Sequence, residues 1–399
     1  MDRLRGMLLM AALGCGTGPR TADAVEPPGA EETGLLNTTP SDPGERPIQP
    51  DDAPTPLPAA APSPLQDIAF HKIRGATQSG AVFDLGASGS FDAFWATCPS
   101  VQFDGKLYRM WYSSVYDNRM GAGGIGLVTS PDGLHWTRAN GGKPVLQVGP
   151  PGAFDDGQVL APEVLYDGTR YRMWYTGSST KWHTSGVCHY RIGLALSKDG
   201  IHWQRANHGR PVLDLGAAGS YDGVQAATPT VLVDADGYRM WYAAWAPRPD
   251  HTICVARSRD GIHWQREDDG KPVTGLLPTR AYGPKVCRVG NQLLLLFAGS
   301  VRSKGTYLFG AVSSDGFQWA MIGKGQPIIP PGVARDFDAE ATYHPAILRV
   351  DDRLRVWYTG VVQQRPQKKR ATDRGAARRG TNRLQIGLAE ARLRKPAVR

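Results

Sequence analysis

The chain has 399 residues and a formal net charge of +9; 41% of its residues are hydrophobic and 21% are charged. Its 48 Gly, 31 Pro and 11 Trp, together with many strand-length runs rich in Val, Ile and Tyr, favour an all-β protein with many turns and argue against a helical one. Much of the basic excess falls in residues 365–383 and in the tail 392–399, where aromatic residues do not interleave with it, so nucleic-acid binding is disfavoured.

Residues 1–15 have the features of a secretory signal. Arg3 and Arg5 precede an apolar run that is too short to span a bilayer as a helix. The run ends at Cys15 and resembles a bacterial lipobox, in which a cysteine receives lipid after cleavage, although Ala12 stands where Leu is usual. We therefore expect an exported lipoprotein of the bacterial outer membrane, cell surface or periplasm, which meets the membrane through its N-terminal lipid only.

Residues 16–66 are predicted to be a disordered linker. They are rich in Pro, Ala and acidic residues and almost lack aromatic ones, and such a composition buries too little apolar surface to fold. The folded region is expected to span residues 67–391, followed by the basic tail.

Four cysteines remain once Cys15 is set aside: Cys98, Cys188, Cys254 and Cys287. Export permits disulfides, but the spacing is not that of a disulfide-dense module, so paired and free thiols both stay open. No clustered thiol spacing predicts a zinc site.

Four copies of Ser-x-Asp-Gly-x-x-Trp occur along the folded region. Their aspartates, which lie 67, 61 and 55 residues apart, are Asp132, Asp199, Asp260 and Asp315. A period of this length is typical of the blades of a propeller. We expect Asp-Gly to form a two-residue hairpin with positive φ at both positions, and the Trp to pack between adjacent sheets. The motif is therefore interpreted as structural.

Two further phrases precede the hairpins and occur five times. An x-Pro-x-Val run (x-Pro-x-Ile in the last unit) begins at residues 98, 161, 228, 283 and 344, and a run of the YRMWY type follows it. This order predicts four antiparallel strands per unit. The fifth unit lacks its Trp strand, and "AFHKIRGATQSGAVFDLG" (69–86) aligns with "GIHWQRANHGRPVLDLG" (200–216). An N-terminal strand that completes the last sheet would remove its open edge. The sequence thus predicts an all-β, five-bladed β-propeller closed by its N-terminal strand.

The phrases PxV, YRMWY, IGLA and SxDGxxW between residues 67 and 391 resemble those of the five-bladed propeller glycosidases, which include arabinanases, levansucrases and invertases, and of the related β-mannoside phosphorylases. The resemblance implies an oligo- or polysaccharide bound in a central funnel. It also implies an Asp base, a Glu acid and a third carboxylate that tunes the acid, because such groups protonate the leaving oxygen and activate water on opposite faces of a sugar. No cofactor is predicted, although some relatives hold a calcium or sodium ion in the channel.

This chain departs from that family at the position directly before the strand proline. A carboxylate often stands there in the family, whereas the five blades carry Cys98, Ala161, Thr228, Gly283 and His344. The family's catalytic residues therefore cannot be transferred directly.

Two other sets of residues supply candidates. An aromatic-Asp pair stands seven residues before the proline in four blades, at Asp92, Asp155, Asp222 and Asp338. We expect these acids to enter the funnel mouth together, with Asp156 and Glu340 nearby. Recruitment of one or two of them for chemistry or substrate binding stays open beside the alternative that each one caps a turn in its own blade.

The position after the proline breaks the blade symmetry. It carries Ser100, Glu163, Thr230, Lys285 and Ala346, which should project toward the channel. Glu163 is the predicted proton donor, and the predicted base is one of Asp92, Asp222 and Asp338. Lys285, His344 and Arg280 would orient the substrate or tune acidity. The alternative is a Glu163–Lys285 ion pair that plugs the channel.

Blades 2 and 4 have further irregular segments. In "TRAYGPKV", Arg280, Tyr282 and Lys285 could hold a carboxylate or phosphate on a sugar, unless this blade has only drifted, and Phe297 is taken to replace the Trp of YRMWY. The insertion 177–191 should present four side chains to a sugar at a pocket rim: Trp182, His183, His189 and Tyr190. No metal site is predicted there.

We therefore predict a monomeric, exported, lipid-anchored glycoside hydrolase-like propeller that acts on carbohydrate, with phosphorolysis kept open by Arg280 and Lys285. The alternative is a non-catalytic propeller that binds glycans or docks proteins, which the missing carboxylates favour. The basic loop 365–383 is either solvated or binds an anionic glycan, lipopolysaccharide or membrane surface, and a third hypothesis makes it the partner-binding part of a sensor or assembly lipoprotein.

Overall fold

The computed structural model describes residues 65–115, 123–181, 185, 187–247, 251–277, 280–301, 305–363 and 382–393. The predicted signal, almost all of the linker and nearly all of the basic loop lie outside these residues. No helix in the described part of the chain combines the length and hydrophobicity that a membrane span requires.

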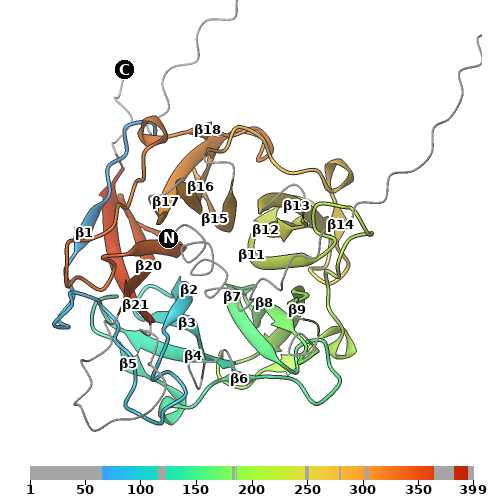
Figure 1. Cartoon of the computed structure of the whole chain (residues 1–399), viewed down its shortest axis with the longest axis horizontal. Coiled ribbons are helices and arrows are strands. Elements are labelled where there is room, and N and C mark those ends of the chain that lie inside the picture. Colours follow the sequence, from blue (N-terminus) through green and yellow to red (C-terminus); the bar gives the residue numbers. More distant parts are fainter. Residues whose placement is uncertain are drawn as a thin grey trace, which may run out of the picture. The chain divides into compact units, whose positions relative to one another are not determined.

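Five antiparallel sheets form five blades around a central axis, as predicted (Figure 1). Their first strands contact one another in turn around that axis. Blade 1 contains β2 (Thr97–Phe103), β3 (Tyr108–Val115), β4 (Gly123–Ser130) and β5 (Thr137–Arg138), with β6 (Leu146–Gln147) also paired to β4. Blade 2 contains β7 (Gln158–Tyr166), β8 (Tyr171–Ser178), β9 (Arg191–Ser197) and β10 (Gln204–Arg205). Blade 3 contains β11 (Gln225–Asp234), β12 (Gly237–Trp245), β13 (Thr252–Ser258) and β14 (Gln265–Arg266). Blades 4 and 5 contain β15 (Ala281–Val289), β16 (Gln292–Val301), β17 (Gly305–Ser313) and β18 (Ala320–Met321); and β19 (Ala341–Val350), β20 (Arg353–Gln363), β21 (Asn382–Arg392) and β1 (His71–Ile73).

The N-terminal strand closes the ring, because β1 pairs with β21 as the outer strand of blade 5. The pairing corrects the sequence alignment of this segment. Lys72 faces Ala389, as Arg205 faces Ala195 in blade 2, so Lys72 rather than Arg74 takes the place of Arg205. The later part of the alignment holds, because Phe83 bridges to β21 as the corresponding Leu213 bridges to β9.

The inner strand of every blade has a bulge at its x-Pro pair, where the register with the second strand shifts. The residue before the proline has a positive φ in each case: Cys98 (49°), Ala161 (49°), Thr228 (47°), Gly283 (58°) and His344 (45°). Residues other than Gly rarely adopt a positive φ. Bulges of this kind change the direction of side chains at the rims of barrels and near functional sites. The bulge turns all five residues toward the axis.

The Asp-Gly turns differ from the predicted two-residue hairpins. Six residues separate β9 from β10, and of the Asp199-Gly200 pair only Gly200 has a positive φ, of 79°. The Asp199 carboxylate instead accepts hydrogen bonds from the backbone N–H groups of Ile201 and His202, and Ser197 Oγ accepts from Gly200 N–H. The other three copies form the same bonds, so a side-chain cap holds the turn, and the motif is structural as expected.

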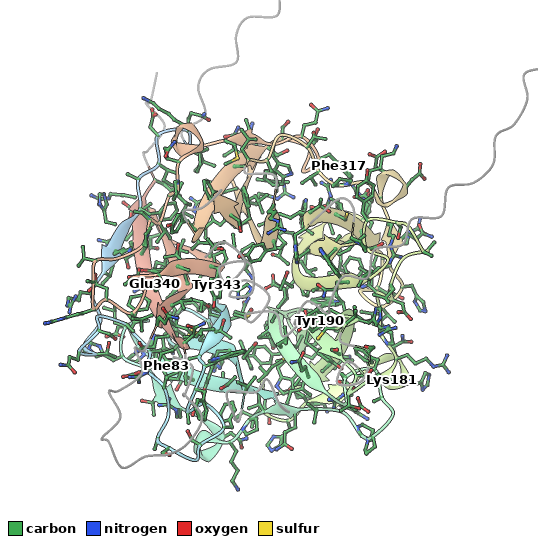
Figure 2. The ribbon with its side chains drawn as sticks, viewed as in Figure 1. Phe83, Lys181, Tyr190, Phe317, Glu340 and Tyr343 are labelled. Atoms are coloured by element: carbon green, nitrogen blue, oxygen red, sulfur yellow. The ribbon has the colours of Figure 1, made fainter. Side chains whose placement is uncertain are left out.

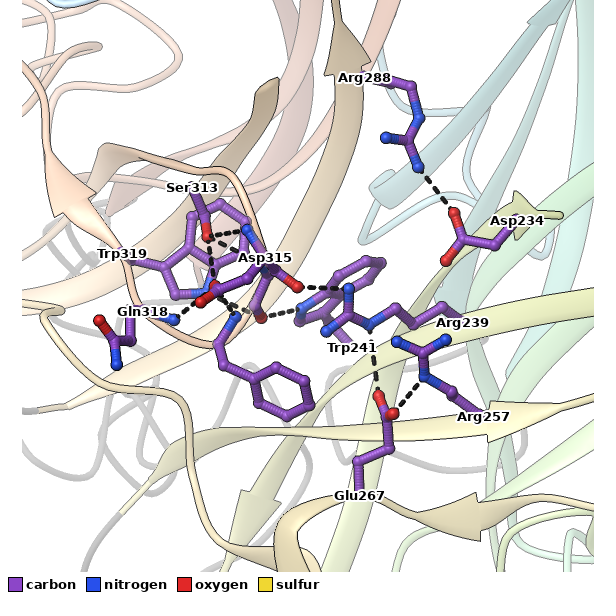
Figure 3. Close-up of polar contacts among 12 residues, drawn as sticks. Asp234, Arg239, Trp241, Arg257, Glu267, Arg288, Ser313, Asp315, Gln318 and Trp319 are labelled. Atoms are coloured by element: carbon purple, nitrogen blue, oxygen red, sulfur yellow. Dashed lines mark hydrogen bonds and ion pairs between the residues drawn. The ribbon is translucent and has the colours of Figure 1, made fainter. Parts of the chain in front are cut away.

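Tryptophans join neighbouring blades at these turns. The Trp of the Asp-Gly motif packs against the adjacent blade as predicted, since the ring centroids of Trp319 and Trp241 are 6.5 Å apart. The YRMWY Trp241 of blade 3 donates its indole N–H to the carbonyl oxygen of Gly316 in blade 4 at 2.9 Å, and Trp319 of the same turn donates at 3.2 Å (Figure 3). Arg239 also crosses this interface, with its guanidinium 4.8 Å from the Trp241 ring and 4.7 Å from the Phe317 ring. Equivalent Trp–Gly bonds connect blades 1 and 2, blades 2 and 3, and blades 5 and 1.

The interface between blades 4 and 5 is built differently, because the outer strand of blade 5 is β1 and brings no Asp-Gly turn. The register places Leu296 opposite Lys285, as Trp241 is opposite Thr230, so Leu296 replaces the Trp and Phe297 replaces the Tyr of YRMWY. This corrects the prediction that Phe297 replaces the Trp. Leu296 packs in an apolar cluster that includes Leu65 from the start of the described chain.

Candidate functional site in the central channel

The five bulges line a small cavity of about 30 Å³ on the axis. Its walls are the five residues before the prolines, the prolines themselves, Glu163 and Lys285. Three predicted site residues that break the blade symmetry, Glu163, Lys285 and His344, are therefore brought together from blades 2, 4 and 5. A cavity of this size has room for one or two groups as large as a water molecule.

Glu163 of blade 2 is held by partners from blades 1, 3 and 4. Its carboxylate forms an ion pair with Lys285 across the channel. It also accepts hydrogen bonds from the hydroxyl of Thr230 at 3.3 Å, from the backbone N–H of Val231 at 3.1 Å and from the hydroxyl of Ser100 at 3.5 Å. Both carboxylate oxygens are engaged by the protein, which is the arrangement of the ion-pair alternative.

His344 lies against Cys98 where blade 5 meets blade 1. Its Nδ1 is 3.1 Å from Cys98 Sγ and 3.5 Å from Thr97 Oγ1, whereas its Nε2 has no hydrogen-bonding partner among the described residues. Burial lowers the pKa of His344 to about 3 and raises the pKa of Cys98 to about 12. The imidazole and the thiol are therefore both uncharged near neutral pH.

Hydroxyl groups of the preceding blade hold three of the strained bulges. The backbone N–H of Ala161 donates to Ser113 Oγ at 2.8 Å, and that of Thr228 donates to Thr176 Oγ1 at 2.8 Å. Cys98 N–H donates in the same way to the Thr359 hydroxyl of blade 5. These bonds fix the channel wall in a conformation that would otherwise cost on the order of 1–3 kcal/mol per residue.

The four aromatic-Asp acids lie within their own blades and are not among the residues that line the channel cavity. Asp222, for example, is 1% exposed and accepts hydrogen bonds from the Tyr242 hydroxyl at 2.9 Å and from Arg266 Nε at 2.7 Å. The same Asp–Tyr–Arg triad forms at Asp92 and Asp155. This corrects the expectation that these acids meet at the funnel mouth.

Blade 5 completes its triad with the N-terminal strand. Asp338 accepts from the Tyr358 hydroxyl at 2.8 Å and forms an ion pair with Lys72 of β1 at 2.6 Å. In Figure 2, Tyr343 on the inner strand of this blade lies near the axis, whereas Phe83, which stacks edge-on against the triad residue Tyr112, lies toward the rim. The triads therefore support the blades rather than the channel wall.

Blade 4 lacks the triad at all three positions. Phe297 stands where the Tyr hydroxyl would be, Met321 stands where the Arg would be, and the residue seven places before the proline is Leu277. The loss of the acid, its donor and its cation together is the change expected when a buried polar group must either keep its partners or be removed with them.

The remaining predicted residues have separate locations. Arg280 is exposed, and Tyr282 is buried with its ring 6.4 Å from that of His344. Tyr190 is fully buried and donates to Gln158 Oε1 at 3.0 Å, which corrects its predicted place at a pocket rim. His189 and Glu340 are exposed, and Asp156 caps backbone N–H groups of Gly152 and Thr180. Trp182 and His183 lie outside the described residues.

The chain is similar to known proteins in sequence and in fold. No protein-family model matches the chain. The uncharacterized protein Rv1502 of Mycobacterium tuberculosis is 27% identical over 228 residues, which make up 55% of this chain and 72% of that protein. A 1,2-beta-oligomannan phosphorylase of Thermoanaerobacter sp. is 28% identical over 152 residues, which make up 36% of this chain and 50% of that enzyme.

A solved structure gives a more extensive match. Its description concerns the GH130 family of mannoside phosphorylases. It says that this family contains glycoside hydrolases that target beta-1,2 mannosidic linkages in Candida mannan. It superposes with a TM-score of 0.58 and 15% identity over 83% of this chain and 97% of that chain. The chain has the five-bladed propeller fold of glycoside hydrolases. At this identity the likeness establishes the fold, and the activity must be argued from the site.

Glu163 is the one carboxylate among the described residues that line the channel cavity. No three His, Cys, Asp or Glu side chains of the described residues come together as a metal site. The carboxylate of Glu163 is already paired with the Lys285 ammonium, which repels a cation. A calcium or sodium ion in the channel stays a prediction.

Sequence reasoning missed two polar residues of the channel. Thr228 and Cys98 were noted only as replacements for a carboxylate, yet the Thr228 hydroxyl is buried without a hydrogen-bonding partner in the described ranges, and Cys98 contacts His344. The available signal was their shared position before the proline in adjacent blades. The catalytic roles assigned to Glu163, Asp92, Asp222 and Asp338 stay predictions.

Proposed function

We propose that this protein binds carbohydrate at the channel of its propeller. It does not hydrolyse the carbohydrate with Glu163 as proton donor and one of Asp92, Asp222 and Asp338 as base. One observation carries the proposal. Among the described residues that line the channel cavity, Glu163 is the only carboxylate, and its two oxygens accept four contacts from the protein. An inverting hydrolase needs two carboxyl groups about 6.5–9.5 Å apart with room for water between them.

Carbohydrate is the ligand class that the related proteins support. The Thermoanaerobacter relative is named for a 1,2-beta-oligomannan, and the solved structure for beta-1,2 mannosidic linkages. The channel adds buried polar groups without partners in the described chain, at His344 and Thr228, and the buried rings of Tyr282 and Tyr343 lie beside His344. Convergent polar groups beside aromatic side chains are typical of sugar sites.

The proposal is tested by measuring binding and turnover on the same ligands. The full chain is titrated calorimetrically with neutral and acidic oligosaccharides, among them β-1,2-linked mannobiose, and the products are separated by chromatography with and without inorganic phosphate. We expect binding without turnover. Failure to bind any sugar would overturn the proposal.

Phosphorolysis or hydrolysis is the second candidate, which the name of the Thermoanaerobacter relative favours. Turnover by the wild-type chain that Glu163→Gln abolishes, with folding intact, would establish that candidate and refute binding without chemistry. Glu390→Gln is the matched control, because Glu390 also pairs with a buried cation, Arg355 at 2.8 Å, but does not line the channel cavity.

Export and lipid attachment complete the proposal for the whole chain. The apolar run and Cys15 support an exported lipoprotein. Labelling with a radioactive fatty acid in bacteria should mark the wild-type protein and leave Cys15→Ala unlabelled; equal labelling of both would refute the anchor.

A further inference from the structure

The tautomer of His344 follows from its neighbours. A neutral imidazole has one N–H donor and one acceptor nitrogen. The Cys98 thiol is protonated because burial raises its pKa to about 12, and it lies 3.1 Å from Nδ1. The distance from Sγ to Nδ1 is shorter than the 3.6 Å from Sγ to Thr97 Oγ1, which fits an S–H group that donates to Nδ1. The imidazole proton is therefore on Nε2.

This N–H belongs to a residue of the cavity wall. His344 is 4% exposed, lines the cavity, and has no partner for Nε2 among the described residues. Gly283 makes room for the ring, because a Cβ at this position would lie 2.8 Å from His344 Cδ2. A buried N–H without a partner favours any ligand that brings an acceptor oxygen to it.

Thr228 supplies a second polar group on the same cavity. It projects from blade 3, is 5% exposed, and its hydroxyl also lacks a partner in the described ranges. A hydroxyl group can both donate and accept. A ligand group that accepts from His344 and either donates to or accepts from Thr228 would satisfy both, and a sugar hydroxyl can do this.

The charges around the cavity cancel. Glu163 and Lys285 form an ion pair, and the buried rings of Tyr282 and Tyr343 have pKa values raised by burial, so they stay neutral. An anionic group would meet the Glu163 carboxylate, and a cationic group would meet Lys285, in a site with room for only one or two water-sized groups to compensate the charge. The cavity of about 30 Å³ admits a hydroxyl or hydroxymethyl group but not a sugar ring.

We infer that this cavity recognises an uncharged hydroxyl or hydroxymethyl group of a carbohydrate, with His344 as a neutral Nε2–H donor whose tautomer Cys98 fixes. The inference rests on the proposed carbohydrate function and deepens it by naming a neutral sugar as the ligand class. It excludes the carboxylate or phosphate that the sequence of blade 4 left open.

The ligand class is tested with matched pairs of sugars. The full chain is titrated with methyl glycosides of mannose, glucose and galactose, with their uronic acids, and with inorganic phosphate. We expect a neutral sugar to bind at least 10-fold more tightly than its uronic acid. His344→Phe and Thr228→Val should each weaken this binding about 10-fold, whereas Thr342→Val, which removes a buried hydroxyl that does not line the cavity, should leave it unchanged. Tighter binding of a uronic acid or phosphate would overturn the inference.

The tautomer is tested separately by ¹⁵N NMR of labelled histidine. The His344 resonances should show an unprotonated Nδ1 and a protonated Nε2 from pH 8 to pH 5, and Cys98→Ser should keep this state because the serine hydroxyl can also donate. A protonated Nδ1, or a cationic ring in this pH range, would overturn the assignment even if sugars bind. Conversely, an Nε2–H tautomer with no sugar bound would refute the proposed function and the ligand class together while leaving the Cys98–His344 assignment standing.

Discussion

The contact between Glu163 and Lys285 decides whether Glu163 is available as a proton donor or is engaged in a structural ion pair. Each lies one place after the strand proline, in blades 2 and 4, and the two side chains are 4% and 12% exposed. A buried ion pair of this kind is costly to break on one side, because the remaining charge loses its compensation. The hydroxyls of Ser100 and Thr230 add further bonds to the same carboxylate.

Removing one partner of this pair should cost more stability than its share of removing both, because a single variant leaves the other charge buried without compensation. We expect Glu163→Gln and Lys285→Met each to lower the free energy of unfolding by about 3 kcal/mol, and the double variant to lose clearly less than the sum. Urea unfolding of the four proteins measures the coupling. Additive losses would mean that the two side chains do not interact in solution, and the argument for an engaged Glu163 would fail.

At the scale of elements, the N-terminal strand does two jobs for blade 5. It supplies the outer strand that the other blades take from their own Asp-Gly hairpin, and it supplies Lys72 as the cation of the triad at Asp338. Residues before it also pack at the interface between blades 4 and 5, where Leu65 and Leu296 replace a Trp–Gly hydrogen bond. The Leu296 position of blade 4 therefore follows from the way the ring closes.

The Lys72 ion pair should stabilise this closure. Lys72→Met leaves the buried Asp338 carboxylate with the Tyr358 hydroxyl but without its cation, and we expect a loss of about 2 kcal/mol, discounted because Lys72 is 32% exposed. Arg74→Met is the matched control, since Arg74 is 66% exposed in its ion pair, and should change stability little. Equal effects of the two changes would restore the original alignment of this strand.

At the scale of the whole molecule, acid should weaken the propeller in two pH ranges. His344 has a pKa lowered by burial from 6.5 to about 3, so the unfolded chain binds a proton there before the folded chain does. Hydrogen bonds from the His202 side chain and backbone lower the pKa of Asp199, and a hydrogen bond from Arg109 lowers that of Asp104 to about 2. Both kinds of group contribute stability that is lost as pH falls, the histidine below pH 6.5 and the carboxylates below their ordinary pKa near 4.

The histidine part of this loss can be isolated. Between pH 7 and pH 5, His344 should contribute a decrease of about 2 kcal/mol in the free energy of unfolding, because only the unfolded state gains the proton. Urea unfolding at the two pH values should show this decrease in the wild-type chain and a correspondingly smaller one in His344→Gln. The same decrease in both proteins would show that His344 titrates normally in the folded state.

The repeats allowed much of the architecture to be predicted, because the strands, turns and interblade tryptophans of each blade are encoded in one short continuous segment of the sequence. The number of blades, the order of strands and the pairing of β1 with the last sheet are all confirmed. The Asp-Gly turns were predicted with the wrong geometry because a carboxylate cap, rather than two positive φ angles, holds them.

The channel depends on contacts that no local pattern encodes. The Glu163–Lys285 pair joins residues 122 apart, and the Cys98–His344 pair joins residues 246 apart. The repeated x-Pro pair marked the five positions before the proline that line the cavity, whereas three of the five positions after it, Ser100, Thr230 and Ala346, do not line it. Only the closed ring decided which of those side chains meet, because that depends on how far each blade is rotated and on which blades become neighbours. The aromatic-Asp acids differ, because packing within each folded blade buries Asp92, Asp155 and Asp222 beside a Tyr and an Arg.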